Sequence, residues 1–134
     1  SHAMGYALEG LLRFHATARD LPSLAAARRG LEWLASQAIR HDGIPAWIPA
    51  DPPEFRSDAQ IQFLRLASTL GLPREAEEAG AACRRRLARL RAREGQWLVG
   101  DGAPPSISSR VAAWTTLFDL ASRLPGAAPP ERLL

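Results

Sequence analysis

Apolar residues recur every three or four positions along most of the 134-residue chain. This spacing is typical of helices that bury one face, and it predicts helices over residues 3–18, 22–39, 57–70 and 73–93, with a fifth from residue 109. No segment alternates apolar and polar residues in the way that predicts strands. The sequence therefore predicts an all-α protein of about five helices.

Residues at the segment boundaries support these limits. Pro22 suits the first turn of the second helix, because a helix leaves the N–H groups of that turn unbonded and proline has none. Ser57 and Gln60 have the spacing of a capping box, in which the serine accepts from the backbone and the glutamine reaches back to it. Gly71 predicts a left-handed stop for the third helix, and Pro73 opens the fourth.

The connections between the predicted helices are of two kinds. Only a few residues join the first helix to the second and the third to the fourth, which predicts antiparallel hairpins. Long loops over residues 40–57 and 94–108 make the other connections, and each contains Gly, Trp, Asp and Pro. Because hairpins alternate in direction, both long loops are expected at the same end of the bundle. Long ordered loops on a rigid frame commonly carry function.

A repeat underlies this organisation. Residues 66–70 (LASTL) match residues 120–124 (LASRL), 54 positions later, and the two long loops also correspond. We therefore predict about two and a half helical hairpins of roughly 50 residues each. They form a single repeat domain over residues 1–124, followed by a Pro-rich tail over residues 125–134.

The second predicted helix and the loop after it resemble the QW motif of squalene-cyclase-type repeats. The residues that carry the resemblance are Arg29, Gly30, Trp33, Leu34, Gln37, Gly43 and Trp47. That motif belongs to the α/α toroids, rings of helical hairpins in which Gln and Trp tie the end of one helix to the start of the next. A Gln amide can satisfy backbone groups at a helix end, and an indole can cover them. The resemblance implies that this stretch fastens helices and that the chain is part of a toroid.

Carbohydrate-processing α/α toroids, which include polysaccharide lyases and glycoside hydrolases, are built from similar hairpins, and the chain resembles the last third of such a protein. The acidic initiator motif of squalene-type cyclases, DxDD, is absent, which favours this branch over a terpenoid-cyclase-like or prenyltransferase-like toroid. Since two and a half hairpins cannot close a ring, either earlier hairpins are missing, or copies associate, or the protein is an open solenoid, and we favour a C-terminal segment. Its active site would be completed by an N-terminal remainder of the protein or by self-association.

The resemblance makes residues at the long-loop end candidates for a site. A lyase needs a His or Tyr base and an arginine that neutralises a uronate carboxylate, whereas a hydrolase needs two carboxylates. The candidate catalytic residues are His2, Tyr6, Arg56 and Arg110. The candidate substrate-binding residues are Trp47, Asp51, Glu54, Gln60, Trp97 and Trp114. The expected substrate is a carbohydrate or another small molecule, and no cofactor or metal site is expected. A non-catalytic helical-repeat interaction domain is the alternative of another class.

Several of the polar and aromatic residues also have simpler interpretations. Asp42 precedes a glycine and is typical of a turn, and Asp58 suits the positive end of a helix dipole. Trp47 and Trp97 are expected to anchor their loops to the core. His15 lies on an apolar helical face and is expected to be a hydrogen-bonded, buried or half-buried side chain.

The charged residues and the single cysteine restrict the partners. All 17 basic side chains are Arg, and a net charge of +3 is too small to indicate nucleic acid. Six of the arginines, between residues 84 and 93, cover the helix side opposite Cys83 and Leu87, as expected for a solvated outer face. A lone Cys83 leaves no disulfide and no thiolate metal site. No unbroken apolar stretch of ~20 residues predicts a membrane span, and no leader is visible, which favours a cytoplasmic location.

Overall fold

The computed structural model describes residues 2–48, 52–71 and 75–90. Within these ranges the chain forms four helices, α1 (His2–Ala18), α2 (Leu21–His41), α3 (Ser57–Leu70) and α4 (Glu75–Arg89), and no strand. An isolated antiparallel bridge joins Pro45 to Phe55. The all-α prediction is confirmed for this part of the chain. The expected fifth helix and the tail over residues 125–134 lie outside the described residues.

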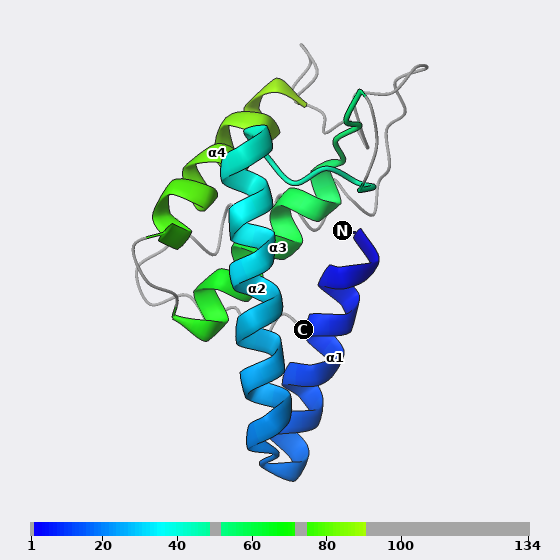
Figure 1. Cartoon of the computed structure of the whole chain (residues 1–134), viewed down its shortest axis with the longest axis vertical. Coiled ribbons are helices and arrows are strands. Elements are labelled where there is room, and N and C mark those ends of the chain that lie inside the picture. The colour runs from blue at the N-terminus through cyan, green and yellow to red at the C-terminus, as the bar shows by residue number, and fades with distance from the viewer. Residues whose placement is uncertain (1, 49–51, 72–74, 91–134) are drawn as a thin grey trace.

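The helices pack as two neighbouring hairpins. α1 packs against α2, and α3 packs against α4. Across the two pairs, α1 contacts α3 and α2 contacts α4 (Figure 1). The carboxyl end of α2 and the amino ends of α1 and α3 therefore lie toward the end where the loop between α2 and α3 emerges. None of the described helices is long and apolar enough to cross a membrane.

The core consists of the apolar stripes that the helical spacing predicts. Its largest fully buried apolar side chains are Leu8, Leu31, Leu34, Ile44, Ile61, Phe63 and Leu66. Leu8 of α1 lies so close to Gly30 of α2 that a Cβ at Gly30 would stand 2.4 Å from a Leu8 methyl group. The absence of a side chain at Gly30 thus lets the first hairpin pack tightly.

The helix ends between α1 and α2 and after α3 follow the predicted chemistry. Asp20 is the N-cap of α2, and its carboxylate accepts a hydrogen bond from the backbone N–H of Ser23 at 2.8 Å. Pro22 occupies the first turn, as expected. Gly71 ends α3 in the left-handed conformation at φ 60°, and its N–H bonds to the carbonyl of Ala67.

The capping box predicted at the start of α3 is wrong. The N-cap residue is Arg56, which makes no side-chain cap hydrogen bond. Gln60 does not reach back to an amide of the first turn, because its side-chain oxygen accepts from the N–H of Ile44 instead. Every residue of α3 from 57 to 66 is buried, so its polar side chains lie within the protein, where each polar atom without a partner is destabilising.

Candidate functional site

The loop between α2 and α3 is held closed by its own backbone. Asp42 takes the left-handed conformation at the end of α2, with φ 52°, and confirms the prediction of a turn residue. Gly43 follows with φ 136°, and its N–H donates to the carbonyl of Ala38 at 2.9 Å. The two arms of the loop then meet where Ala46 donates to the carbonyl of Glu54 at 2.8 Å, beside the bridge of Pro45.

Gln60 clamps this loop to the core. Its side-chain oxygen accepts from the N–H of Ile44 at 2.7 Å, and its Nε2 donates to the carbonyl of the same residue at 2.7 Å. The Nε2 also donates to the carbonyl of Arg56 at 3.0 Å. Since Gln60 is 0% exposed, these bonds satisfy backbone groups that water does not reach. The sequence assigned Gln60 to substrate binding, whereas the structure uses its amide to fasten the loop.

Arginines of α4 complete the carboxyl end of α2. The Arg86 guanidinium donates to the carbonyls of Asp42 at 3.0 Å and His41 at 3.3 Å, and it stacks 3.6 Å from the centroid of the Phe55 ring. Positive charge at this position also complements the negative end of the helix dipole. Arg85 and Arg89 pair with the Asp42 carboxylate at 2.7 and 3.0 Å.

The predicted solvated face is therefore only partly correct. Arg84, Arg85 and Arg89 are exposed, but Arg86 is half-buried and structural. The hydrogen bond from Arg85 holds the pKa of the Asp42 carboxyl below its usual value. Cys83, on the opposite side of α4, is fully buried, and burial raises the pKa of its thiol to about 12. A thiol in this state is a packing group and not a nucleophile.

Three predicted site residues come together on the outer side of this end. Arg56 donates to both carboxylate oxygens of Asp58, at 3.1 and 2.8 Å. The hydrogen bond to Asp58 is the main reason that the pKa of Arg56 is raised, and the charge of Asp58 and the nearby Glu54 and Tyr6 act in the same direction. Tyr6 comes from α1 and Glu54 from the loop, so the fold joins residues that are far apart in sequence.

Two aromatic residues from this part of the chain are exposed. Trp47 is 60% exposed and Tyr6 is 47% exposed. We expected Trp47 to anchor the loop to the core, and this expectation is wrong, because Pro45, Phe55 and Gln60 already close the loop beneath it. Gln37, the other residue from which the QW resemblance implied a tie, bonds only to the neighbouring Ser36 hydroxyl among the described residues.

The other predicted site residues contribute less to this picture. His2 is the first residue of α1. Asp51, Trp97, Arg110 and Trp114 lie outside the described residues.

The sequence analysis missed Arg86 and Phe55, which contact each other across about 30 residues of sequence. A half-buried arginine in a run of exposed ones differs from them only through its tertiary partner, so the sequence offered no signal for it.

Comparisons with models of known families, with curated proteins and with solved structures find no match. The chemistry must therefore be argued from the geometry itself. Within the described residues, no group of three or more His, Cys, Asp or Glu side chains could hold a metal ion. Tyr6 and Glu54 lie near the paired Arg56 and Asp58, and the exposed Trp47 belongs to the same loop as Glu54.

Proposed function

We propose that the long-loop end is a carbohydrate-binding surface of a carbohydrate-processing α/α toroid. One observation carries the proposal: Trp47 is 60% exposed, and the backbone just before it is tethered, at Ile44 by Gln60 and at Ala46 by the carbonyl of Glu54. An exposed indole is ordinarily mobile, but here the backbone beneath it is fixed by Gln60 and by the bridge between Pro45 and Phe55. A preorganised aromatic face binds at low entropic cost.

The surrounding groups fit a sugar better than an apolar ligand. A pyranose ring presents C–H groups on its face, which pack on aromatic rings, and hydroxyl groups at its edge, which need polar partners. Trp47 and Tyr6 supply aromatic faces, and the exposed Glu54 supplies an acceptor for hydroxyl groups. The packing of α1 on α3 and of α2 on α4 is the relation that adjacent hairpins have in a toroid, which supports the wider assignment.

The geometry favours binding over acid–base chemistry. A lyase would use Arg56 to neutralise a uronate carboxylate, but Asp58 already occupies that guanidinium with two hydrogen bonds. An arginine with a bidentate partner has little free charge to offer a second carboxylate. We therefore place this surface in substrate capture and not in the chemical step.

The test is a binding screen of the full chain against neutral and uronate-containing polysaccharides by affinity electrophoresis, followed by calorimetry on oligosaccharides. Trp47→Ala is expected to weaken binding at least about fivefold, because a stacked aromatic contributes about 1 kcal/mol beyond its buried area. Trp33→Ala is the matched control, since Trp33 is also exposed but lies on α2. Equal losses for the two variants, or no binding to any polysaccharide, would overturn the proposal.

A second candidate function, self-association, rests on the outer face of α1. Met4, Ala7, Leu11, Phe14 and Ala18 follow a spacing of three and four residues, and all but the half-buried Leu11 are exposed. This apolar stripe carries no charge, so two copies can meet without repulsion. Light scattering over a range of concentrations should show dimers that Phe14→Arg abolishes. A monomer at every concentration would exclude this candidate.

A further inference from the structure

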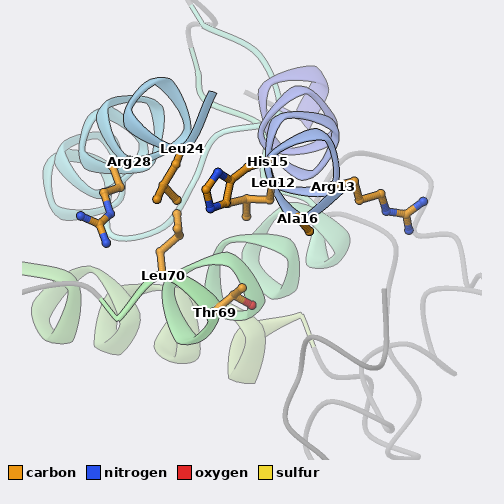
Figure 2. Close-up of a pocket in the computed structure, with 8 residues that line it drawn as sticks. All are labelled: Leu12, Arg13, His15, Ala16, Leu24, Arg28, Thr69 and Leu70. Atoms are coloured by element: carbon orange, nitrogen blue, oxygen red, sulfur yellow. The ribbon is translucent and has the colours of Figure 1, made fainter. Parts of the chain in front are cut away.

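A cavity lies at the opposite end of the molecule from the long loop. The cavity, of about 470 Å³, opens between the last turns of α1, the first turns of α2 and the end of α3. Figure 2 shows the lining side chains, which come from these three helices. Its volume is within the range of about 300–1,000 Å³ that is typical of small-molecule sites. Nothing in the sequence pattern pointed to it.

The interior of the cavity is mainly apolar. Leu12 and Ala16 come from α1, Leu24 from α2 and Leu70 from α3. In Figure 2 Leu24, Leu12 and Leu70 face one another across the space. The lining can therefore accommodate an alkyl chain, whose transfer from water contributes about 0.8 kcal/mol for each buried CH₂ group.

Two polar side chains stand within this apolar lining. His15 Nδ1 lies 2.8 Å from the carbonyl of Asp20 and must donate to it, since a carbonyl can only accept. The Nε2 atom makes no hydrogen bond within the described part of the chain, so it can meet a ligand. Thr69 donates its hydroxyl hydrogen to the carbonyl of Arg65 at 3.0 Å, which leaves its oxygen as an acceptor. His15 thus confirms the expectation of a half-buried, hydrogen-bonded side chain, and it also lines a cavity.

The charged side chains of the lining itself are arginines. Arg28 lies at its edge beside Leu24 and Leu70, and Arg13 lies on the other side and is directed away (Figure 2). No carboxylate belongs to the lining. The nearest acid on the connecting turn, Asp20, directs its carboxylate to the N–H of Ser23 at the start of α2. An anion is therefore favoured at the mouth, and a cation is disfavoured.

We propose that this cavity binds a small amphipathic acid, an alkyl chain that ends in a single carboxylate. The chain lies among Leu12, Leu24 and Leu70, and the carboxylate stays at the mouth, where Arg28 can donate to it. His15 Nε2 makes the second polar contact when the ring is protonated. This site uses none of the residues of the proposed carbohydrate surface, so either can fail without the other.

The first experiment compares two probes that share a tail and differ in charge. Octanoate and octylamine are titrated into the full-length chain by calorimetry, and amide chemical shifts map the site. Octanoate is expected to bind, with shifts concentrated in the last turns of α1 and the first turns of α2. Octylamine is expected to bind at least about tenfold more weakly, because Arg28 in the lining repels an ammonium group. Equal affinity for the two probes would overturn the assignment of an acid.

The second experiment changes the lining. Ala16→Trp fills the cavity from an exposed helical position and is expected to lower octanoate affinity at least about tenfold. Arg28→Ala is expected to lower it about threefold, since an exposed charge pair contributes little. Arg29→Ala removes a neighbouring exposed arginine outside the lining and should leave the affinity unchanged.

Circular dichroism distinguishes a blocked site from a misfolded chain. If Ala16→Trp loses helical content, the octanoate affinities of Arg28→Ala and Arg29→Ala still test the site, because neither change touches the core. Undetectable octanoate binding to the unmodified chain, or equal affinities across all three variants, would overturn the proposal.

Discussion

The two ends of α2 are built in contrasting ways. At its carboxyl end, Arg86 donates to the carbonyls of His41 and Asp42, and Gln60 satisfies both backbone groups of Ile44. At its amino end, the side chain of Asp20 makes one cap bond to Ser23. One end is thus closed by many long-range polar contacts, whereas the other is a short local turn.

The contrast shows that the hydrogen bonds needed by buried backbone groups decide which end of a small helical protein is filled. A long loop buries backbone groups, and each of these needs a partner, so polar contacts fill the described part of the loop end. A tight turn needs few partners, and only apolar side chains close the helices near it. Where those side chains do not meet, as around Leu24 and Leu70, a cavity remains. The closed end presents a surface, and the open end presents a pocket.

The largest expected effect concerns Cys83, which lies beneath the closed end. Its thiol is fully buried, and burial raises its pKa to about 12. Since only the thiolate reacts with disulfide reagents, labelling at pH 8 should be at least about a thousandfold slower in the native chain than in urea. Cys83 is the only cysteine, so the colour change of such a reagent measures this site alone. Fast native labelling would mean that the loop end opens readily.

The next effect separates two buried glutamines of α3. Gln60→Met removes three hydrogen bonds, two of them to the N–H and the carbonyl of the buried Ile44, which should lower the free energy of unfolding by about 3 kcal/mol. Gln62→Met is the matched control. Gln62 is buried as well, but its Nε2 has no hydrogen-bond partner among the described residues, so the change should be nearly neutral or stabilising. Urea unfolding measures the free energy of unfolding of both variants, and equal losses would show that the hydrogen bonds of Gln60 do not stabilise the loop.

The sequence predicted helices well because local spacing determines them. The ends of α1, the Asp20–Pro22 turn and the Gly71 stop depend on neighbouring residues, and the structure has them within about two positions of the prediction. The hairpins followed from loop length alone. These features need no knowledge of what lies across the fold.

The candidate site was harder to predict, because its chemistry depends on tertiary partners. Gln60 and Arg56 look available in the sequence, yet Ile44 occupies one and Asp58 the other. The sequence predicts that Trp47 packs on the core, yet its side chain is 60% exposed. The cavity around His15 depends on the positions of three helix ends, which no local pattern encodes.

One glycine at each end of the bundle tests how tightly that end is packed. Gly43 has φ 136°, and a Cβ there would lie 3.0 Å from Arg86 side-chain carbons, so Gly43→Ala should cost about 2–3 kcal/mol. Gly71 has φ 60° and open space around it, so Gly71→Ala should cost about 1 kcal/mol. Thermal unfolding of the two variants measures the difference. A smaller loss of stability for Gly43→Ala than for Gly71→Ala would contradict a tightly packed loop end. As a control, Gly10→Ala in an exposed part of α1 should raise stability by about 0.5 kcal/mol.

The smallest effect is the pH dependence of the two caps of α2. Hydrogen bonds lower the pKa of Asp42, chiefly from Arg85, and that of Asp20, from Ser23. A carboxyl whose pKa is lower in the folded than in the unfolded chain stabilises the fold above the unfolded value of 3.8. This stabilisation is lost as the pH falls through the folded pKa, so the free energy of unfolding should decline below about pH 5.

Asparagine variants separate the contributions of the two ends. Asp42→Asn and Asp20→Asn should each flatten the decline, because each removes one titrating group while keeping an acceptor. Salt then distinguishes them. The Asp42 contribution involves exposed arginines of α4 and should shrink at high ionic strength, whereas the local cap of Asp20 should persist. If salt reduces both contributions equally, the ion pairs of Asp42 with the arginines of α4 stabilise the fold no more than the local cap of Asp20 does.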